Sequence, residues 1–486
     1  MSRRESQPRG VLVLAAVEMW ERFSFYGMVA LLVLFLIRPE DGPWPPGPGQ
    51  GFTEADAAAL FGSYSALILA APLIGGWIGD RLTGPRRALV FGGVLIAVGH
   101  FVMLAASPAI FWVGLLVIAA GTGLLKPNIS TVLGGLYSEG DTRRDGGFAM
   151  FYFGINAGAF TAPIICGWIA NTYSWHAAFS VAGFGMLAGL LVYVFGRHRL
   201  GDVGMKAPTP ASVVERRKAL VVLVAGVAIL AIVFTAVIAV AGFTATAVSA
   251  VVALSIIAIA VVAFRALLRR TGTGDIERRH MRAFLLLFIS TVIYFALSSQ
   301  AGSTITEFTQ TWIDRDVAGF TIPTSWLLSL NPVLVVMLAP ISAWLWLRLG
   351  DRAPSTPTKI ALSLVGVGLS FLVIAIPGFR SQNGLMSSSL WILAAFLVLT
   401  SAELLIVPIA LSATTELAPP GLTGQMLGLW YLAAALGGAV GGQFARFVVD
   451  LGYGGYFLSA GAIVIVVGCI FLLVRPRWTA LLSPIR

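Results

Sequence analysis

The sequence E-M-W-E-R-F-S-F-Y-G occupies residues 18–27, in the middle of an otherwise apolar run over residues 11–37. On a helix, the spacing of Glu18, Glu21 and Arg22 puts all three on one face, and Phe25 and Tyr26 continue that stripe. A charge at the centre of a bilayer costs about 2.5 to 3.5 kcal/mol, so these groups must face partners or water rather than lipid. The stripe indicates either structural ion pairs between helices or a proton or substrate site inside a helix bundle.

The composition is that of a polytopic membrane protein. Hydrophobic residues make up 58% of the 486 residues and charged residues 11%, whereas about a quarter of residues are charged in soluble proteins. No small-residue cleavage site follows the first apolar run, so we expect it to be a mature span rather than a signal peptide. The net charge of +10 comes from short loops between spans, so it reports topology and does not indicate a nucleic-acid partner.

Catalytic and metal chemistry are not indicated. Cys166 and Cys469 lie far apart in apolar runs, and the four histidines have no ligand spacing, so neither a disulfide framework nor a metal site is expected. Residues 121–128 lack the Gly-Lys-Ser/Thr ending of a phosphate-binding loop, which argues against nucleotide binding. We find no nucleophile and base pair at bilayer depth, and therefore expect a chain that is not an enzyme and holds no cofactor.

The apolar runs predict about fourteen membrane-spanning helices at about 20 residues per crossing. Nearly all Lys and Arg residues fall in the tails and loops on the side of the two termini, and the exceptions on the other side are Arg38, Arg315, Arg380 and Arg446. The positive-inside rule then places both termini in the cytoplasm. The predicted spans are residues 11–37, 56–79, 88–106, 109–134, 148–170, 176–195, 218–241, 245–267, 283–300, 325–347, 359–376, 389–412, 424–447 and 456–474.

A weak internal sequence repeat suggests that the chain has two related halves. The glycine-rich loop at residues 75–87 looks like the loop between the second and third helices of the major facilitator superfamily. A weaker version of the surrounding sequence recurs in the second half, at residues 339–362. We therefore expect a six-helix bundle in residues 1–200, an inserted hairpin of two lipid-facing helices in residues 201–280 and a second six-helix bundle in residues 281–486, with a substrate site where the bundles meet.

Three further polar groups are predicted at bilayer depth. Lys126 is a buried cation that needs an anionic partner, for which Glu18 and Glu21 are the candidates. Asn156 is suited either to a polar cavity or to holding helices together. Glu403 is a lone carboxylate among apolar residues, so it would carry a proton or meet a cationic ligand.

Taken together, these motifs resemble the proton-dependent oligopeptide transporter family of the major facilitator superfamily. The resemblance covers essentially the whole chain, and its most specific part is Glu18-x-x-Glu21-Arg22-Phe23. The other matching stretches are residues 126–128, 151–158, 402–405 and 429–430, the last of which contains Trp430.

The resemblance implies a proton-coupled symporter that imports di- and tripeptides by alternating access. Arg22 and Lys126, helped by Tyr26, would bind the peptide carboxylate, and Glu403, with Asn156 and Asn331, would bind the amino group. Trp430 is expected in the substrate site as well. Protonation of Glu18 or Glu21 would release Lys126 or Arg22 for the substrate. The protein is expected to act as a monomer in the bacterial plasma membrane.

Several positions depart from the family pattern. Phe25, Val29, Phe295, Ser299 and Leu69 stand where many members have Tyr, Arg, Trp, Glu and Tyr. These changes predict altered proton coupling and a preference for peptides with bulky apolar side chains. The alternative is a transporter of the same fold for another solute, such as nitrate, a peptide-like antibiotic or a secondary metabolite, either as an exporter or with altered proton coupling.

Overall fold

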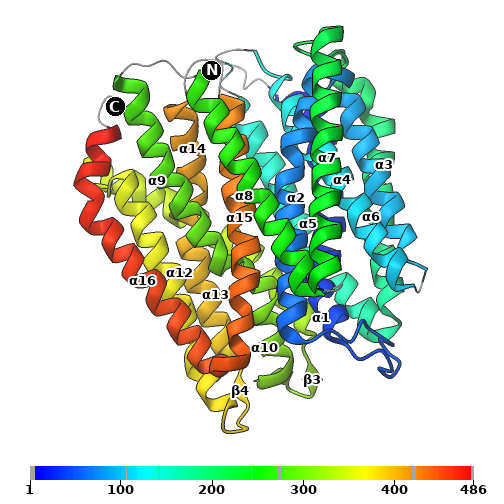
Figure 1. Cartoon of the computed structure of the whole chain (residues 1–486), viewed down its shortest axis with the longest axis vertical. Coiled ribbons are helices and arrows are strands. Elements are labelled where there is room, and N and C mark those ends of the chain that lie inside the picture. Colours follow the sequence, from blue (N-terminus) through cyan, green and yellow to red (C-terminus); the bar gives the residue numbers. More distant parts are fainter. Residues whose placement is uncertain are drawn as a thin grey trace. The chain divides into compact units, whose positions relative to one another are not determined.

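The structure is a computed structural model that describes residues 6–105, 107–138, 141, 143–241, 244–270, 275–418 and 423–482 (Figure 1). Twelve helical segments in this part of the chain are long and apolar enough to cross a membrane. The last segment, Gln425–Leu481, contains two successive helices, and α7 (Val213–Ala241) adds a further helix of 29 residues. The predicted class, an all-α polytopic membrane protein, is therefore confirmed.

The chain forms two compact units. Unit 1 comprises residues 1–51 and 70–236, and unit 2 comprises residues 52–69 and 237–486. The helix α2 (Glu54–Ile78) is shared, because its first half belongs to unit 2 and its second half to unit 1. The predicted division at residues 200 and 280 stays a prediction.

Unit 1 is organised around α1 (Arg9–Ile37). Residues around nearly the whole circumference of α1 are buried, and α1 packs most extensively against α5 and α6. The core joins Leu14 and Val17 to Leu125 and Ile129 of α4 and to Met186 of α6. The other elements of this unit are the second half of α2, a π-helical turn η1 (Gly79–Thr83), α3 (Pro85–Val102), α4 (Pro108–Gly134), α5 (Arg144–Thr172), α6 (Trp175–Gly196), η2 (Arg197–Leu200) and most of α7.

Unit 2 contains the first half of α2 and the helices that follow α7. Figure 1 shows α12 and α16 side by side, and their contact is the most extensive between any two helices in the described part of the chain. Gly368 permits this approach, because a Cβ atom there would lie 2.7 Å from the carbonyl oxygen of Gly461. The elements are α8 (Ala245–Arg270), α9 (Asp275–Ser298), η3 (Ser299–Gly302), α10 (Thr304–Trp312), η4 (Thr324–Ser329), α11 (Leu330–Leu349), η5 (Gly350–Arg352), α12 (Thr356–Ser381), α13 (Leu390–Leu404), α14 (Val407–Leu417), α15 (Thr423–Phe444), η6 (Ala445–Phe447) and α16 (Val448–Leu482).

Two predicted spans are interrupted in the structure. The span predicted at residues 389–412 consists of α13 and α14, which are separated at Leu405 and Ile406 before Pro408. The span predicted at residues 283–300 continues beyond its expected end through η3 into α10. Both interruptions lie beside polar side chains, Glu403 in the first case and Gln300 in the second.

Four two-residue strands connect the helices of unit 2. β1 (Ile313–Asp314) pairs in parallel with β4 (Ser387–Ser388). β2 (Asp316–Val317) and β3 (Phe320–Thr321) pair as an antiparallel hairpin. These short pairings bring together two connections between helices.

Many large apolar side chains remain exposed on the helices. Phe195 of α6 is 75% exposed and Leu473 of α16 is 80% exposed. The helix α8 packs against α15, where Gln443 Nε2 donates to Ser249 Oγ at 2.5 Å. Exposed apolar side chains at such density indicate surfaces that contact lipid rather than water.

Candidate functional site

The charged residues of the opening stretch form one buried ion cluster on α1. Glu18, Glu21 and Arg22 are 2%, 1% and 3% exposed. The Arg22 guanidinium binds both oxygens of Glu21, with Nε to Oε2 at 2.5 Å and Nη2 to Oε1 at 2.6 Å. Nε also lies 3.5 Å from Oε1 of Glu18, one turn earlier. Since Oε2 of Glu18 is buried without a hydrogen-bond partner in the described chain, Glu18 is the less satisfied carboxylate.

Lys126 contributes a second positive charge to this cluster from α4. Its side chain is half-buried, and its charge interacts with Glu18, Glu21 and Arg22. Among the described residues, no carboxylate oxygen lies within 4.0 Å of its Nζ. The direct ion pair expected for Lys126 is therefore replaced by a longer-range interaction with Glu21 and Glu18. This leaves the ammonium of Lys126 available to an additional anion.

Close helix packing holds the cluster in place. Gly158 of α5 lies so near α1 that a Cβ atom there would overlap the carbonyl oxygen of Met19. On α4, Asn128 follows Lys126 by one half-turn and is fully buried. Its Nδ2 donates to the carbonyl oxygens of Gly75 at 3.0 Å and Leu124 at 2.7 Å, which ties α4 to the second half of α2.

Aromatic side chains continue the stripe along α1. The guanidinium carbon of Arg22 lies 4.7 Å from the centroid of the Phe25 ring, a cation–π distance. The ring of Phe25 in turn packs edge-on against Tyr26, with centroids 5.1 Å apart. Arg22 thus contacts the carboxylates of Glu21 and Glu18 and the face of the Phe25 ring, which adds an apolar surface to the charged stripe.

Asn156 lies in unit 1, on α5. Its Nδ2 donates to the carbonyl oxygen of Tyr152 at 2.9 Å, one turn earlier in the same helix. This bond is internal to α5, so it does not link α5 to another helix, which was one of the two roles expected for Asn156. The carbonyl oxygen of the Asn156 side chain can still accept a hydrogen bond from a ligand.

Glu403 lies in unit 2 at the end of α13. Asn331, in the first turn of α11, donates through Nδ2 to Glu403 Oε2 at 2.6 Å and also lies 3.2 Å from Thr400 Oγ1. Within the part of the chain that the structure describes, no Lys, Arg or His nitrogen lies within 4.0 Å of Glu403. Sequence reasoning missed Thr400 and the buried Tyr294, whose hydroxyl group interacts electrostatically with Glu403.

Trp430 of α15 packs beside Phe295 of α9. The two ring centroids are 6.2 Å apart in an edge-to-face arrangement, and Trp430 is 3% exposed. Its indole Nε1 is buried and has no hydrogen-bond partner among the described residues. A buried donor without a partner is costly, so this N–H group is suited to a ligand acceptor.

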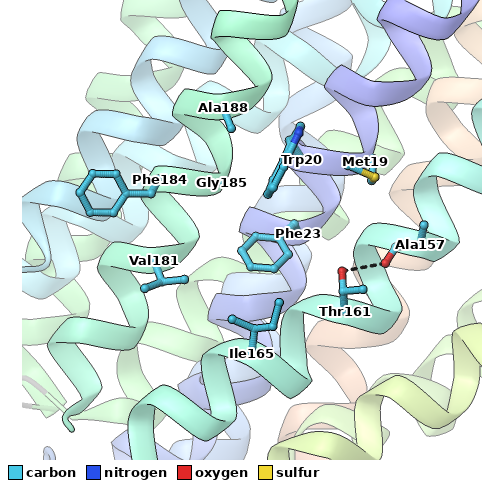
Figure 2. Close-up of a pocket in the computed structure, with 10 residues that line it drawn as sticks. All are labelled: Met19, Trp20, Phe23, Ala157, Thr161, Ile165, Val181, Phe184, Gly185 and Ala188. Carbon is cyan, nitrogen blue, oxygen red and sulfur yellow. Dashed lines mark hydrogen bonds between the residues drawn. The ribbon is translucent and has the colours of Figure 1, made fainter.

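The back of α1 borders a different, apolar pocket of about 480 Å³. Figure 2 shows Trp20 and Phe23 of α1 facing α5 and α6, and Thr161 donates its hydroxyl within α5 to the carbonyl oxygen of Ala157. At about 100° per residue, Met19 and Phe23 lie about 160° around α1 from Glu21, so the pocket is on the other side of the helix from that carboxylate. It contains no charged side chain and is not suited to a zwitterion.

Comparisons with known proteins identify the family. A family model described as the POT family matches residues 86–456. The chain belongs to the POT family. The uncharacterized transporter YclF of Bacillus subtilis is 36% identical over 96% of this chain and 94% of its own length. A di-/tripeptide transporter of Lactococcus lactis subsp. cremoris is 35% identical over 99% of this chain and 97% of its own length.

A solved POT-family structure confirms the fold. The crystal structure of a peptide transporter POT in complex with sulfate matches with a TM-score of 0.91 and 36% identity, covering 99% of this chain and 96% of that one. The expected major facilitator fold is thus confirmed. Members of this family are transporters, so the prediction that the chain is not an enzyme is confirmed as well. In the described residues, no group of three or more His, Cys, Asp or Glu residues could hold a metal ion.

Positions that depart from the POT family pattern lie in buried or half-buried places. Val29 is 8% exposed on α1, and Ser299 is half-buried at the start of η3. Neither side chain is ionisable, so neither position leaves an unpaired charge. Phe25 and Phe295 each pack against another aromatic ring, Tyr26 and Trp430, and both units therefore place an apolar ring near their polar groups.

Proposed function

We propose that this protein is a proton-coupled symporter that imports di- and tripeptides by alternating access. The observation that carries the proposal is a charge without an ionic partner in each unit. Lys126 in unit 1 and Glu403 in unit 2 have no oppositely charged group within 4.0 Å among the described residues. A peptide zwitterion supplies both missing charges, its carboxylate for Lys126 and its amino group for Glu403.

Each end of the peptide has further candidate contacts. At one end, Arg22 and Tyr26 would bind the peptide carboxylate together with Lys126. At the other end, Asn331 donates a hydrogen bond to Glu403. Asn156 and the free indole N–H group of Trp430 can bind the polar groups of the peptide between its two ends. The similarity to the di-/tripeptide transporter of Lactococcus lactis supports the same class of solute.

Protons are the proposed coupling ion, and Glu18, Glu21, Arg22 and Lys126 are the proposed coupling residues. Two carboxylates share the Arg22 guanidinium, so protonation of one of them loosens its hold on Arg22 and Lys126. A neutral peptide carried with one proton moves one charge. That charge is worth about 2.3 kcal/mol per 100 mV, or about fiftyfold accumulation.

The excess of Lys and Arg on the side of the termini supports a cytoplasmic position for both. We place the protein in the bacterial plasma membrane as a monomer. The ring pair of Phe295 and Trp430 supports a preference for peptides with apolar side chains. Nitrate fits less well, because a single anion gains nothing from the carboxylate of Glu403.

Proteoliposomes with an imposed pH gradient test this function. Labelled dipeptide should accumulate when the outside is acidic, and a protonophore should abolish the accumulation. Counterflow of dipeptide that does not respond to the gradient would instead favour a transporter of the same fold without proton coupling. Equal competition by charged and apolar dipeptides would contradict the proposed side-chain preference.

A further inference from the structure

Glu307 is a buried carboxylate that the proposed transport mechanism does not use. It lies in α10 and is 1% exposed, and its Oε1 atom is buried with no hydrogen-bond partner among the described residues. No described Lys, Arg or His nitrogen lies within 4.0 Å of it. An ionised carboxylate in such a place loses its hydration and gains no countercharge, so the protonated form is favoured.

The charged group that interacts with Glu307 is a second carboxylate, Glu54 in the first turn of α2. Both residues belong to unit 2. Glu54 Oε2 accepts a hydrogen bond of 2.5 Å from the hydroxyl of Tyr453 on α16. Because the Tyr453 hydroxyl has only one proton and donates it to Glu54, it has no proton left to donate to Glu307.

Among the described residues, no Lys, Arg or His forms an ion pair with Glu54 or Glu307. Tyr456 of α16 interacts electrostatically with Glu307, and its hydroxyl donates to Gln300 Oε1 at 2.8 Å. Gln300 in turn donates through Nε2 to the carbonyl oxygen of Ala296. Arg446 forms an ion pair with Asp56 on α2, with Nη2 3.8 Å from Oδ1.

The pair sits where the first half of α2 packs tightly within unit 2. A Cβ atom on Gly62 would lie 2.7 Å from the carbonyl oxygen of Gly438, and one on Gly302 would overlap the ring of Phe61. The Tyr453 ring is fixed by Phe308, with centroids 5.0 Å apart, and by Phe457 at 5.9 Å. Two negative charges on Glu54 and Glu307 would repel each other and weaken this packing.

We infer that Glu307, with Glu54 as its charged neighbour, forms a site that binds one proton and stabilises the packing of the first half of α2 in unit 2. The site is separate from the charged stripe on α1, and its argument does not depend on which solute is carried. The packed arrangement binds one proton more than an arrangement in which both carboxylates reach water. By linkage, its stability is present at low pH and is lost as pH rises.

Infrared spectroscopy of the full-length protein in lipid nanodiscs tests for the proton. The carbonyl stretch of protonated carboxyl groups is recorded while the pH is raised, without any substrate. We expect one band that disappears in Glu307→Gln and persists in Glu40→Gln, a matched change at an exposed loop position. In Glu54→Gln, the Glu307 band should be lost at a lower pH than in the wild type, because the like charge is gone.

Tyr453→Phe keeps the ring and removes only the hydroxyl, so it tests the link to Glu54 without disturbing the packing. We expect it to shift the titration of the same band. An unchanged spectrum in Glu307→Gln, or an unchanged titration in both Glu54→Gln and Tyr453→Phe, would overturn the inference. Failure of dipeptide uptake would not, since these spectra need no transport.

Hydrogen exchange of the amides in residues 57–69 tests the consequence for α2. At low pH the wild type and Glu307→Gln should exchange equally. Above the pH at which the proton is lost, the wild type should exchange faster than Glu307→Gln by up to about tenfold for each pH unit. If the wild type and Glu307→Gln exchange equally at every pH while the infrared band shows the proton, the pair binds a proton without stabilising the packing of α2. That result would overturn this part of the inference.

Discussion

Arg22 forms its two short bonds with Glu21, the residue directly before it in the sequence, and only a longer contact of 3.5 Å with Glu18 one helical turn away. The two carboxylates of the α1 stripe are therefore not equivalent. Glu21 neutralises Arg22 directly, while one oxygen of Glu18 remains buried and unbonded among the described residues. Lys126 balances the remaining charge from a greater distance.

Replacement of the two carboxylates should have unequal effects. We expect Glu21→Gln to lower proton-driven dipeptide uptake by about tenfold or more, because it removes two charge-assisted hydrogen bonds to Arg22. Glu18→Gln should have a smaller effect. Counterflow, which needs no net proton movement, should survive in both variants. A larger loss in Glu18→Gln than in Glu21→Gln would contradict this ranking.

Glu403→Gln should weaken the binding of dipeptides with a free amino group by about tenfold or more, the value of a buried charge-assisted hydrogen bond. An N-acetylated dipeptide has no ammonium group, so its binding should change little. Calorimetry or fluorescence binding with both ligands measures the difference. Glu416→Gln, a change at an exposed carboxylate of α14, is the control and should alter neither affinity. Equal losses for both ligands would mean that Glu403 does not bind the amino group.

Lys126→Ala should have the complementary effect on the other end of the peptide. We expect a loss of about tenfold or more in affinity for dipeptides with a free carboxylate and little change for C-terminally amidated ones. Lys206→Ala removes an exposed lysine of the same unit and serves as the control. If amidated and free dipeptides lose affinity to the same extent, Lys126 acts on the structure and not on the carboxylate.

Gly75 is a position where the packing of α2 against α4 tolerates no side chain. A Cβ atom there would overlap the carbonyl oxygen of Gly123, so Gly75→Ala should destabilise the protein by about 1 to 3 kcal/mol. Gly226→Ala in α7 is the matched control, since no atom lies within 4 Å of its Cβ position. It should be neutral or stabilise the helix by about 0.5 to 1 kcal/mol. Thermal unfolding in detergent compares the two, and equal melting temperatures would contradict the packing argument.

The positions of the spans could be predicted from the sequence because apolar runs of sufficient length leave few alternatives in a bilayer. The charged stripe of α1 could be predicted equally well, since the spacing of its residues on a helix does not depend on tertiary contacts. The ion-pair partners of these charged side chains were harder to predict. The sequence suggested Lys126 as a direct partner of Glu18 or Glu21, but the Arg22 side chain, which is closer along the helix, occupies Glu21.

Glu307 was missed because the sequence around it looks like a polar loop. Thr306 and Thr309 lie buried in or beside α10, and their hydroxyls donate to backbone carbonyl oxygens of Ala301 and Ile305. Such local bonds allow a polar sequence to continue as a buried helix beyond the apolar run. The break between α13 and α14, by contrast, had a readable signal in Pro408, which removes a backbone donor.

The central claim, that a zwitterion and a proton cross together, is tested most directly by the current that they carry. Dipeptide added to the acidic side of liposomes on a solid-supported membrane should produce a transient current with the sign of cation entry. The current should be absent in Glu21→Gln and strongly reduced in Glu403→Gln. Dipeptide uptake without any current, or a current that is unchanged in both variants, would contradict the account.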